Sequence, residues 1–332
     1  MEDTHSMKFK VVISDYNYED PSREKAVLEP IGAEVFLYDN RTDETRIANC
    51  RDADAIICEE GPFRRNVIEK LERCKAIVGY GAGYEHIDLK AATEKGIAAA
   101  NTPGYGNEEV SDHALALMYA CARKIVKANR IANSGLQSWN SRPLRNIYRL
   151  KGKTVGVIGV GRIGSTFARK VAALDYRVIF YDPYVSAEKG KAFGAEKVDL
   201  ETLMRESDFI SIHCLHNQET HHLIGRKQLE MMKPTAYIVN TARGGIIDQE
   251  ELTVALESGR IAGAGLDVHE QEPPPPHVRE RLMKLDNVIT TPHSAWYSQE
   301  SMHDRQRMAA ETVRDILLGK RPECVLNPEV FR

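Results

Sequence analysis

Apolar residues follow two alternating patterns along this chain. Short, nearly continuous apolar runs are typical of strands covered on both faces of a parallel sheet. Segments in which apolar residues return every three or four positions are typical of amphipathic helices. The predicted strands are 8–14, 34–38, 55–58, 76–79, 96–100, 155–158, 177–181, 208–213, 236–240, 261–267 and 287–290. The predicted helices are 23–31, 108–129, 165–173, 225–231, 248–258 and 299–318. Their alternation predicts an α/β fold with parallel sheets and helices on both faces.

A glycine-rich turn joins the predicted strand 155–158 to the helix after it. Gly159, Gly161 and Gly164 form the pattern G-x-G-x-x-G. In a dinucleotide-binding turn the first glycine permits the tight turn, and the second lets a pyrophosphate approach the backbone. The third lets the helix pack against the strand, and the N–H groups at the helix start face the phosphates. Alone, the pattern is equally compatible with a plain strand-to-helix turn.

An acidic residue at the end of the next strand strengthens the cofactor interpretation. Asp182 follows strand 177–181 and lies about 20 residues after Gly161, which is the spacing of a carboxylate that binds a ribose 2′-hydroxyl. Such a carboxylate would repel the 2′-phosphate of NADP. We therefore expect a dinucleotide site that favours NAD.

Length and composition limit the classes of protein to consider. A chain of 332 residues suggests about two domains, and the turn cluster 101–104 is a plausible crossing between them. The net charge of −3 gives no general attraction to nucleic acid or anionic membranes. No apolar run approaches the ~20 residues that span a bilayer, and the first residues lack a signal-peptide pattern. Six scattered cysteines favour reduced thiols in the cytoplasm.

Residues with useful chemistry stand just beyond the ends of three later strands. They are Arg243, Glu272 with its neighbour Glu270, and His293. Ligands of open α/β sheets bind beyond the carboxyl ends of the strands, so we expect these side chains to meet. Arginine offers a planar fork for a carboxylate. Histidine exchanges a proton near neutral pH, and a neighbouring glutamate would favour its charged form.

Plainer interpretations of these residues stay open on the sequence alone. Arg243 could hydrogen-bond carbonyls within its own loop, His293 could be a turn residue, and Glu272 could be solvated. The histidines at 213, 216, 221 and 222 could suggest a metal. No ligand set at matching spacing completes such a site, so we expect no metal.

Six segments, in order, resemble the D-isomer-specific 2-hydroxyacid dehydrogenases. They are GYGAGYEHID (79–88), NTPGYGNEEVSDHALAL (101–117), GVIGVGRIGSTFARK (156–170), VNTARGGIID (239–248), GLDVHEQEP (265–273) and TPHSAW (291–296). The resemblance covers essentially the whole chain from Met7. Within the family, IHCLHNQETHHLI (212–224), DVHEQEP and PHSAWYS are most similar to the C-terminal-binding-protein branch.

This resemblance implies two Rossmann-like, doubly wound parallel-sheet domains with an active-site cleft between them. The substrate-binding domain would comprise 7–103 and 299–332, and the NAD-binding domain 104–298. The implied reaction interconverts a 2-oxo acid and a D-2-hydroxy acid by hydride transfer with NAD. Family members are usually homodimers formed through the cofactor domains.

The resemblance also implies roles for particular residues. Arg243 would bind the substrate carboxylate, His293 would be the acid/base, and Glu272 would be its partner. The substrate would also meet the backbone N–H groups of Ala82 and Gly83, and Trp296 would line its pocket. Cofactor contacts would come from Gly159, Gly161, Arg162, Ile163, Gly164, Asp182, His213, Cys214, Thr220, Thr241, Ala242, Arg243, Asp267 and His293.

The substrate is the least constrained part of this prediction. Trp296, Tyr80 and Tyr84 favour an apolar or aromatic side chain, whereas a phosphorylated substrate would need more basic residues than can be placed. The alternatives are a phosphoglycerate or glyoxylate/hydroxypyruvate specialist of the same family, or an NAD-sensing protein of the corepressor type. One departure from the family pattern is Ser111-Asp112-His113, where many members have Ala-Glu-His.

Overall fold

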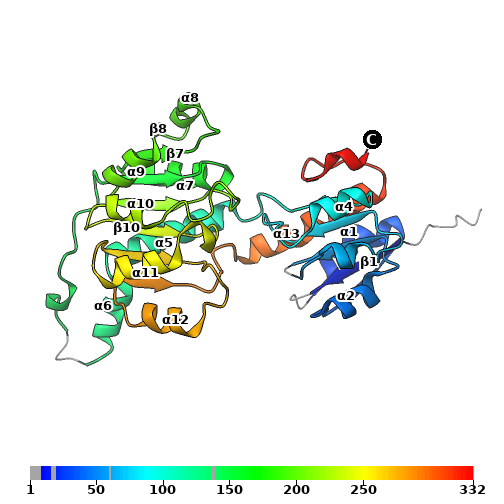
Figure 1. The fold of residues 1–332 in the computed structure, drawn as a ribbon, viewed down its shortest axis with the longest axis horizontal. Helices are drawn as coiled ribbons and strands as arrows, with labels where there is room; N and C mark the ends of the chain where they lie inside the picture. Colours follow the sequence, from blue (N-terminus) through cyan, green and yellow to red (C-terminus); the bar gives the residue numbers. More distant parts are fainter. Residues whose placement is uncertain (1–8, 16–19, 60, 136–138, 332) are drawn as a thin grey trace, which may run out of the picture. The chain divides into compact units, whose positions relative to one another are not determined.

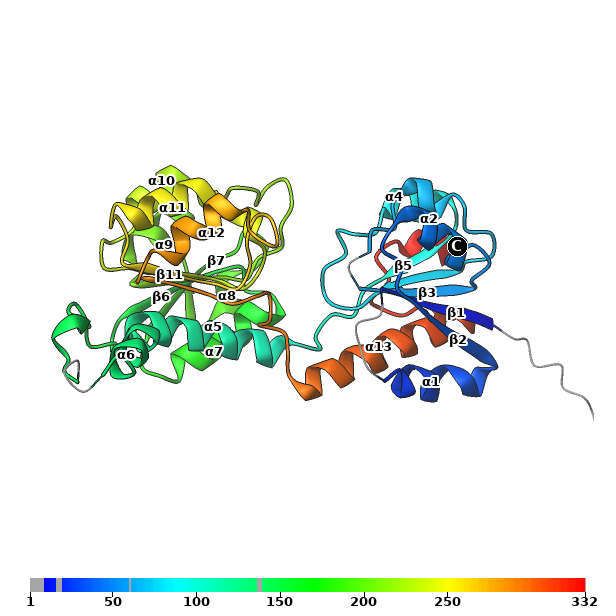
Figure 2. The same ribbon diagram turned by 90° about the horizontal axis from the view of Figure 1, so that it is seen from below.

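Two parallel sheets organise the chain, which the computed structural model describes over residues 9–15, 20–59, 61–135 and 139–331. Unit 1 comprises the chain up to Tyr105 and the part that begins at Ser298, and unit 2 comprises Gly106–Tyr297. Helices cover both faces of each sheet (Figures 1 and 2). The prediction of two doubly wound α/β domains is thereby confirmed.

Unit 1 contains a five-stranded sheet in the order β2-β1-β3-β4-β5, with every neighbouring pair parallel. Its strands are β1 (Phe9–Ser14), β2 (Ala33–Tyr38), β3 (Ala55–Cys58), β4 (Ala76–Gly79) and β5 (Ala98–Ala100). Its helices are α1 (Ser22–Leu28), α2 (Asp43–Cys50), α3 (Arg65–Ile68), α4 (Leu89–Glu94) and α13 (Gln299–Leu317), with short 3-10 turns η1 (Glu29–Ile31) and η5 (Pro328–Phe331).

The core of unit 1 lies on both faces of this sheet because successive strand residues point to opposite sides. In β1, Val11 and Ile13 join the cluster that contains Val313 of α13. Val12, between them, joins the cluster on the other face with Phe63 and Val67. The last long helix of the chain, α13, therefore packs against one face of the sheet that contains the first strand.

Unit 2 contains a seven-stranded parallel sheet in the order β12-β11-β10-β9-β6-β7-β8. Its strands are β6 (Thr154–Ile158), β7 (Arg177–Tyr181), β8 (Ala195–Lys197), β9 (Phe209–Ile212), β10 (Tyr237–Asn240), β11 (Gly263–Leu266) and β12 (Val288–Thr290). Its longer helices are α5 (Asn107–Ala122), α6 (Ile125–Ala132), α7 (Arg162–Ala172), α11 (Gln249–Glu257) and α12 (Pro276–Met283). The shorter ones are α8 (Ala187–Lys191), α9 (Leu200–Glu206), α10 (Arg226–Met231), η3 (Arg142–Leu144) and η4 (Gly244–Ile246).

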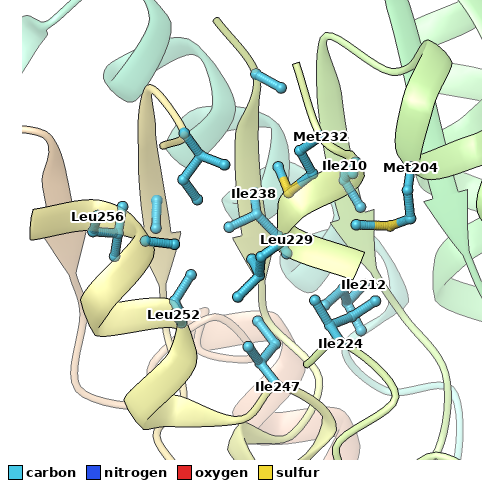
Figure 3. Close-up of a cluster of buried hydrophobic side chains, with 14 of the residues drawn as sticks. Met204, Ile210, Ile212, Ile224, Leu229, Met232, Ile238, Ile247, Leu252 and Leu256 are labelled. Carbon is cyan, nitrogen blue, oxygen red and sulfur yellow. The ribbon is translucent and has the colours of Figure 1, made fainter. Parts of the chain in front are cut away.

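The strand order of unit 2 reverses between β6 and β9, which is where open α/β sheets bind dinucleotides. One face of the sheet packs against α9 to α12, and the other packs against α5 and α7 (Figure 2). Figure 3 shows part of the first core, where Ile238 of β10 lies among Leu229, Leu252 and Leu256. The neighbouring Val239 belongs to the opposite core.

The predicted helix 108–129 is wrong in one respect, because it is two helices. α5 ends at Ala122, and Lys124 then adopts a left-handed conformation with φ of 54° before α6 begins. A left-handed backbone costs a residue with a side chain about 1 kcal/mol or more, and glycine is the residue that usually adopts it. A lysine at this position therefore gives no sequence signal for the break. The amine of Lys124 donates to the carbonyl of Arg145, at 2.6 Å, which holds this break.

One other predicted helix differs from the structure at its start. The helix predicted from 165 begins at Arg162, because Gly161 occupies its N-cap. The proline run 273–276 leads directly into α12, with Pro276 in the first turn. Proline is tolerated there because that position has no intrahelical partner for an N–H group. Six short helices and β8, in 43–50, 65–68, 89–94, 187–191, 195–197, 200–206 and 276–283, were not predicted.

All six cysteines are free thiols. Burial raises the pKa of Cys50 in unit 1 and of Cys121 in unit 2 to about 12. Cys58 is fully buried, and its pKa is raised further for the same reason. These thiols are therefore protonated and unreactive at neutral pH while the protein is folded.

Across the described ranges, no helix is both long and apolar enough to cross a membrane. In the same ranges, histidine, cysteine and acidic side chains nowhere gather in threes as metal ligands.

Candidate active site

The three glycines after β6 differ in what surrounds them. Gly159 has φ of 82°, and a Cβ there would lie 2.6 Å from the Cα of Cys214, which follows β9. A Cβ at Gly164 would lie 2.0 Å from the carbonyl oxygen of Gly159. At Gly161, by contrast, a Cβ would meet no atom within 4 Å. The first and third glycines therefore permit close packing, and the second leaves open space beside the backbone.

That open space lies at the N-terminus of α7, where Gly161 is the N-cap and Arg162 and Ile163 are the first helical residues. The first N–H groups of a helix have no intrahelical partner, and the helix dipole adds positive potential there. This arrangement fits a pyrophosphate. Asp182, after β7, accepts a hydrogen bond from the N–H of Val160, at 3.0 Å, so the acid lies beside the same turn.

A contact that the sequence did not reveal lies next to Asp182. The second carboxylate oxygen of Asp182 accepts from the N–H of Tyr184, at 2.9 Å. The hydroxyl of Tyr184 donates to Glu219 in the segment after β9, at 2.5 Å. Tyr184 thus links the two segments on either side of the strand reversal. Nothing in the periodicity of the sequence indicates this pairing.

The predicted adenosine contacts His213, Cys214 and Thr220 lie in the segment after β9. The ring of His213 packs against Phe167 of α7, at 5.0 Å between centroids, and its Nε2 lies 2.8 Å from Ser211 Oγ. Burial lowers the pKa of His213 to about 3. The hydroxyl of Thr220 donates to the carbonyl of Leu215, at 2.6 Å. The side chains of His213 and Thr220 therefore make contacts within the protein, and Cys214 brings its backbone against the glycine turn.

Arg243, Glu272 and His293 follow β10, β11 and β12, which are neighbours in the sheet. Arg243 is half-buried, and its guanidinium donates to the carbonyl of Ala242, at 2.8 Å. Asn240, the last residue of β10, accepts from the N–H of Ala242 and donates to the carbonyl of Arg243. The strand end thus fixes the backbone that carries the arginine.

His293 and Glu272 form a hydrogen-bonded pair. His293 Nδ1 lies 2.7 Å from Glu272 Oε2, and the N–H of His269 donates to Glu272 Oε1, at 2.9 Å. The hydrogen bond to Glu272 raises the pKa of His293, against the opposing effects of burial and of the charge on Arg243. Burial would raise the pKa of Glu272, but the hydrogen bonds from His293 and His269 outweigh it and lower that pKa.

Asp267 lies beneath the segment that carries His293. Its side chain is 1% exposed, and its carboxylate accepts from Thr291 Oγ1 at 2.5 Å and from the N–H groups of Ser294 and Ala295 at 2.9 Å. Its carbonyl accepts from the N–H of His293, at 2.8 Å. Asp267 was predicted as a cofactor contact, and these hydrogen bonds show that its carboxylate anchors the 291–295 segment.

Glu270 was the alternative partner for His293, but it belongs to another pair. Glu270 Oε1 lies 2.7 Å from the Nε2 of His222, whose ring stacks on His221 at 4.0 Å between centroids. Glu272 is therefore the acid paired with the histidine of the site. Sequence position alone could not separate two glutamates two residues apart.

In unit 1, the glycine loop after β4 carries the predicted carboxylate contacts. Thr102 accepts from the N–H of Gly81, at 2.5 Å, and Asn101 donates to the carbonyl of Ala82, at 2.7 Å. Among the described residues, no protein atom accepts a hydrogen bond from the N–H groups of Ala82 or Gly83. Tyr80, which precedes this loop, is 4% exposed, and its hydroxyl donates to buried Glu24, at 2.5 Å.

Two further features of unit 2 bear on cofactor binding. Thr241, just after β10, is buried, and within the described residues its hydroxyl has no hydrogen-bond partner. Half-buried Ala242 and Trp296 lie in the segments after β10 and β12. An unpaired buried hydroxyl, open space at Gly161 and Asp182 beside the turn together fit a dinucleotide along the carboxyl edge of this sheet.

Comparison with known proteins agrees with this geometry. The sequence profile described as "D-isomer specific 2-hydroxyacid dehydrogenase, NAD binding domain" matches residues 115–295. Glyoxylate reductase of Korarchaeum cryptofilum is 40% identical over 288 residues, which is 86% of each chain. D-3-phosphoglycerate dehydrogenase of Methanocaldococcus jannaschii is 38% identical over 320 residues, which is 96% of this chain and 59% of that protein. The apo structure of D-mandelate dehydrogenase from Rhodotorula graminis matches with a TM-score of 0.86 at 31% identity, covering 96% of this chain and 97% of that one.

Proposed function

Because this chain belongs to the D-isomer-specific 2-hydroxyacid dehydrogenases, we propose that Arg243, Glu272 and His293 carry its reaction. The reaction class is the NAD-dependent interconversion of a 2-oxo acid and a D-2-hydroxy acid. The observation that supports these residues best is the 2.7 Å pair of His293 and Glu272 beside Arg243. It provides a proton donor and a carboxylate-binding group at one edge of the sheet.

In this proposal, Arg243 binds the substrate carboxylate through two parallel hydrogen bonds and orients the C2 carbonyl. His293, protonated because Glu272 stabilises its charged form, donates a proton to the carbonyl oxygen as the hydroxyl forms. In oxidation the neutral ring accepts that proton. Glu272 contacts the ring of His293 and not the substrate, and it holds Nδ1–H so that Nε2 faces the substrate.

NAD(H), when bound, supplies the hydride that is transferred to or from C2. We propose that the α7 N-terminus and Gly161 hold its pyrophosphate, that Asp182 binds the adenosine ribose, and that Thr241 lies near the nicotinamide. The N–H groups of Ala82 and Gly83 in unit 1 are also proposed to bind the substrate carboxylate. The support for this last assignment is that both N–H groups lack a protein acceptor among the described residues.

We propose a small, unphosphorylated 2-oxo acid as the substrate. Glyoxylate reductases are among the similar proteins, and half-buried Trp296 next to the His293 segment suits a small or apolar side chain. The similarity to the C-terminal-binding-protein branch stays a prediction.

The test is reduction by NADH of glyoxylate, hydroxypyruvate, pyruvate, phenylglyoxylate and 3-phosphohydroxypyruvate. The highest kcat/KM is expected for one of the unphosphorylated acids. A clear preference for 3-phosphohydroxypyruvate would favour the phosphoglycerate alternative. NADH binding without turnover of any acid would favour an NAD-sensing role.

We also propose that the protein is a homodimer formed through unit 2. α6 lies at the margin of the unit (Figures 1 and 2), and its first residue, Ile125, is 54% exposed. Trp139, later in the sequence, is 73% exposed. The chain has no acidic residue from 114 to 174 but many basic ones, although its net charge is −3. A basic, apolar segment on one copy would complement the acidic remainder of a second.

The mass in solution tests this dimer. Light scattering should give twice the chain mass for the parent, and Ile125→Glu should yield the monomer. A parent that is monomeric at micromolar concentration would contradict the proposal. The six free thiols further lead us to propose a reducing compartment such as the cytoplasm.

A further inference from the structure

His113 is part of the unusual Ser111-Asp112-His113 sequence, and the mechanism does not use it. It lies on α5, and 26% of its side chain is exposed. Its Nε2 lies 3.0 Å from the hydroxyl oxygen of Thr291, immediately after β12. The same nitrogen lies 3.6 Å from Asp267 Oδ1. His113 thus reaches the buried group that anchors the His293 segment.

The direction of these hydrogen bonds follows from the number of protons available. Thr291 has a single hydroxyl proton, and it donates to Asp267 Oδ1, at 2.5 Å. The hydroxyl oxygen can therefore only accept from His113, so His113 Nε2 carries a proton and donates. His113, Thr291 and Asp267 form a chain in which each group orients the next.

The chain ends at a strained part of the backbone. His293 has φ of 50°, a left-handed conformation that costs a residue with a side chain about 1 kcal/mol or more. Its N–H is held by the carbonyl of Asp267, and the next two N–H groups are held by the carboxylate of Asp267. Such strain persists only where surrounding contacts determine the conformation.

We propose that His113 is a positioning residue for His293, acting through Thr291 and Asp267. Its N–H fixes the Thr291 hydroxyl, which fixes the Asp267 carboxylate, which holds the strained His293 backbone so that the ring meets Glu272. His113 contacts neither substrate nor cofactor in this role. The proposal rests on the proposed function only in that His293 is the acid/base.

Two variants of His113 distinguish the effect of its hydrogen bond from the effect of its side-chain size. His113→Met keeps a large side chain but removes the donor, and His113→Gln places an amide N–H near the position of Nε2. We expect kcat/KM for 2-oxo acid reduction to fall on the order of 10- to 100-fold in His113→Met. His113→Gln should recover most of it, and the NADH Kd should be unchanged in both. Asp112→Asn, which alters the neighbouring surface pair with Lys170, is the control and should keep parental kcat/KM.

A titration of the His293 ring by NMR, with labelled histidine, needs no turnover. The groups that influence this ring are Glu272, Arg243 and Asp267. Its midpoint should fall by about one pH unit in His113→Met, and His113→Gln should restore it. If the parent reduced no 2-oxo acid, the proposed function would fail while this titration still decided the role of His113.

A double-mutant cycle tests the route through Thr291. Thr291→Val should reproduce the His113→Met defect, and the double variant should be little worse than either single one, because both break one chain. Additive losses, or a His113→Met protein with parental kcat/KM and a parental His293 midpoint, would overturn the proposal. A lowered Tm with an unchanged midpoint would likewise reduce His113 to a structural residue.

Discussion

At the level of single residues, the bond between His293 and Glu272 determines how the reaction should respond to pH. The pKa of His293 is raised, chiefly by that hydrogen bond. Reduction needs the protonated ring, so kcat/KM for a 2-oxo acid should be full below this pKa and fall as pH rises through it. Oxidation needs the neutral ring and should show the opposite trend. The measurement is kcat/KM against pH in both directions.

Glu272→Gln is the informative comparison for this profile, because it removes the charge and keeps the shape. The fall in reduction should move to lower pH, towards the unperturbed value of ~6.5. Glu270→Gln should leave the profile unchanged, because Glu270 is bonded to His222. Superimposable profiles for the parent and Glu272→Gln would exclude Glu272 as the partner.

Arg243 supports a prediction about geometry as distinct from charge. Lysine at this position keeps the positive charge but loses the planar fork, so Arg243→Lys should cost about 2–4 kcal/mol of transition-state stabilisation. The loss in kcat/KM should be similar for every 2-oxo acid, since all share the carboxylate. Undiminished efficiency would mean that Arg243 serves only its own loop.

The sequence located these residues because a parallel sheet gathers its strand ends at one edge. It could not decide between Glu270 and Glu272, since the choice depends on which side of the segment faces His293. It also gave no sign of the hydrogen bond between Tyr80 and Glu24, which lie 56 positions apart. Such long-range partners leave no periodic trace in a sequence.

At the level of elements, the glycine turn offers a test in which two similar substitutions should have different effects. Gly161→Ala adds a methyl group where no atom lies within 4 Å, at φ of −64°. Stability should change by only a few tenths of a kcal/mol. The NADH Kd should rise on the order of tenfold or more, because the methyl group occupies the space for the pyrophosphate.

Gly164→Ala should show the reverse pattern. A Cβ there would lie 2.0 Å from the carbonyl oxygen of Gly159, so the turn must shift and unfolding should become easier by about 1–3 kcal/mol. Urea denaturation and fluorescence titration with NADH measure the two effects. Equal loss of NADH affinity and stability in both variants would contradict the separate roles of these glycines.

The predicted bounds agree best with the structure for buried strands, because each of these is a continuous apolar run in the sequence. β3, β4 and β7 have the predicted bounds. The sequence did not predict the break at Lys124, because lysine has no special tendency to end a helix. It also did not predict the short helices, which are stabilised more by packing against neighbouring elements than by the helix propensity of their own residues. Local pattern carries no information about either case.

At the level of the whole molecule, His213 should make stability sensitive to acid. Burial lowers its pKa to about 3, whereas the unfolded chain should titrate near ~6.5. The unfolded state therefore takes up the proton first. Stability is full above pH ~6.5 and declines as pH falls towards 3, by up to about 1.4 kcal/mol per pH unit.

His213→Gln tests this linkage, since the variant cannot take up that proton. Between pH 7 and pH 5 the parent should lose about 2 kcal/mol more stability than the variant. Urea denaturation at each pH, followed by circular dichroism, gives both values. Parallel losses in the two proteins would show that the His213 ring reaches solvent in the folded state.

The buried thiols allow the opening rate of each unit to be measured separately. Only the thiolate attacks an alkylating reagent. Cys50 and Cys58 should therefore react only when unit 1 opens, and Cys121 only when unit 2 opens. Mass spectrometry of timed alkylation would then report two opening rates from one sample. NADH, bound to unit 2, should slow labelling of Cys121 and leave that of Cys50 unchanged.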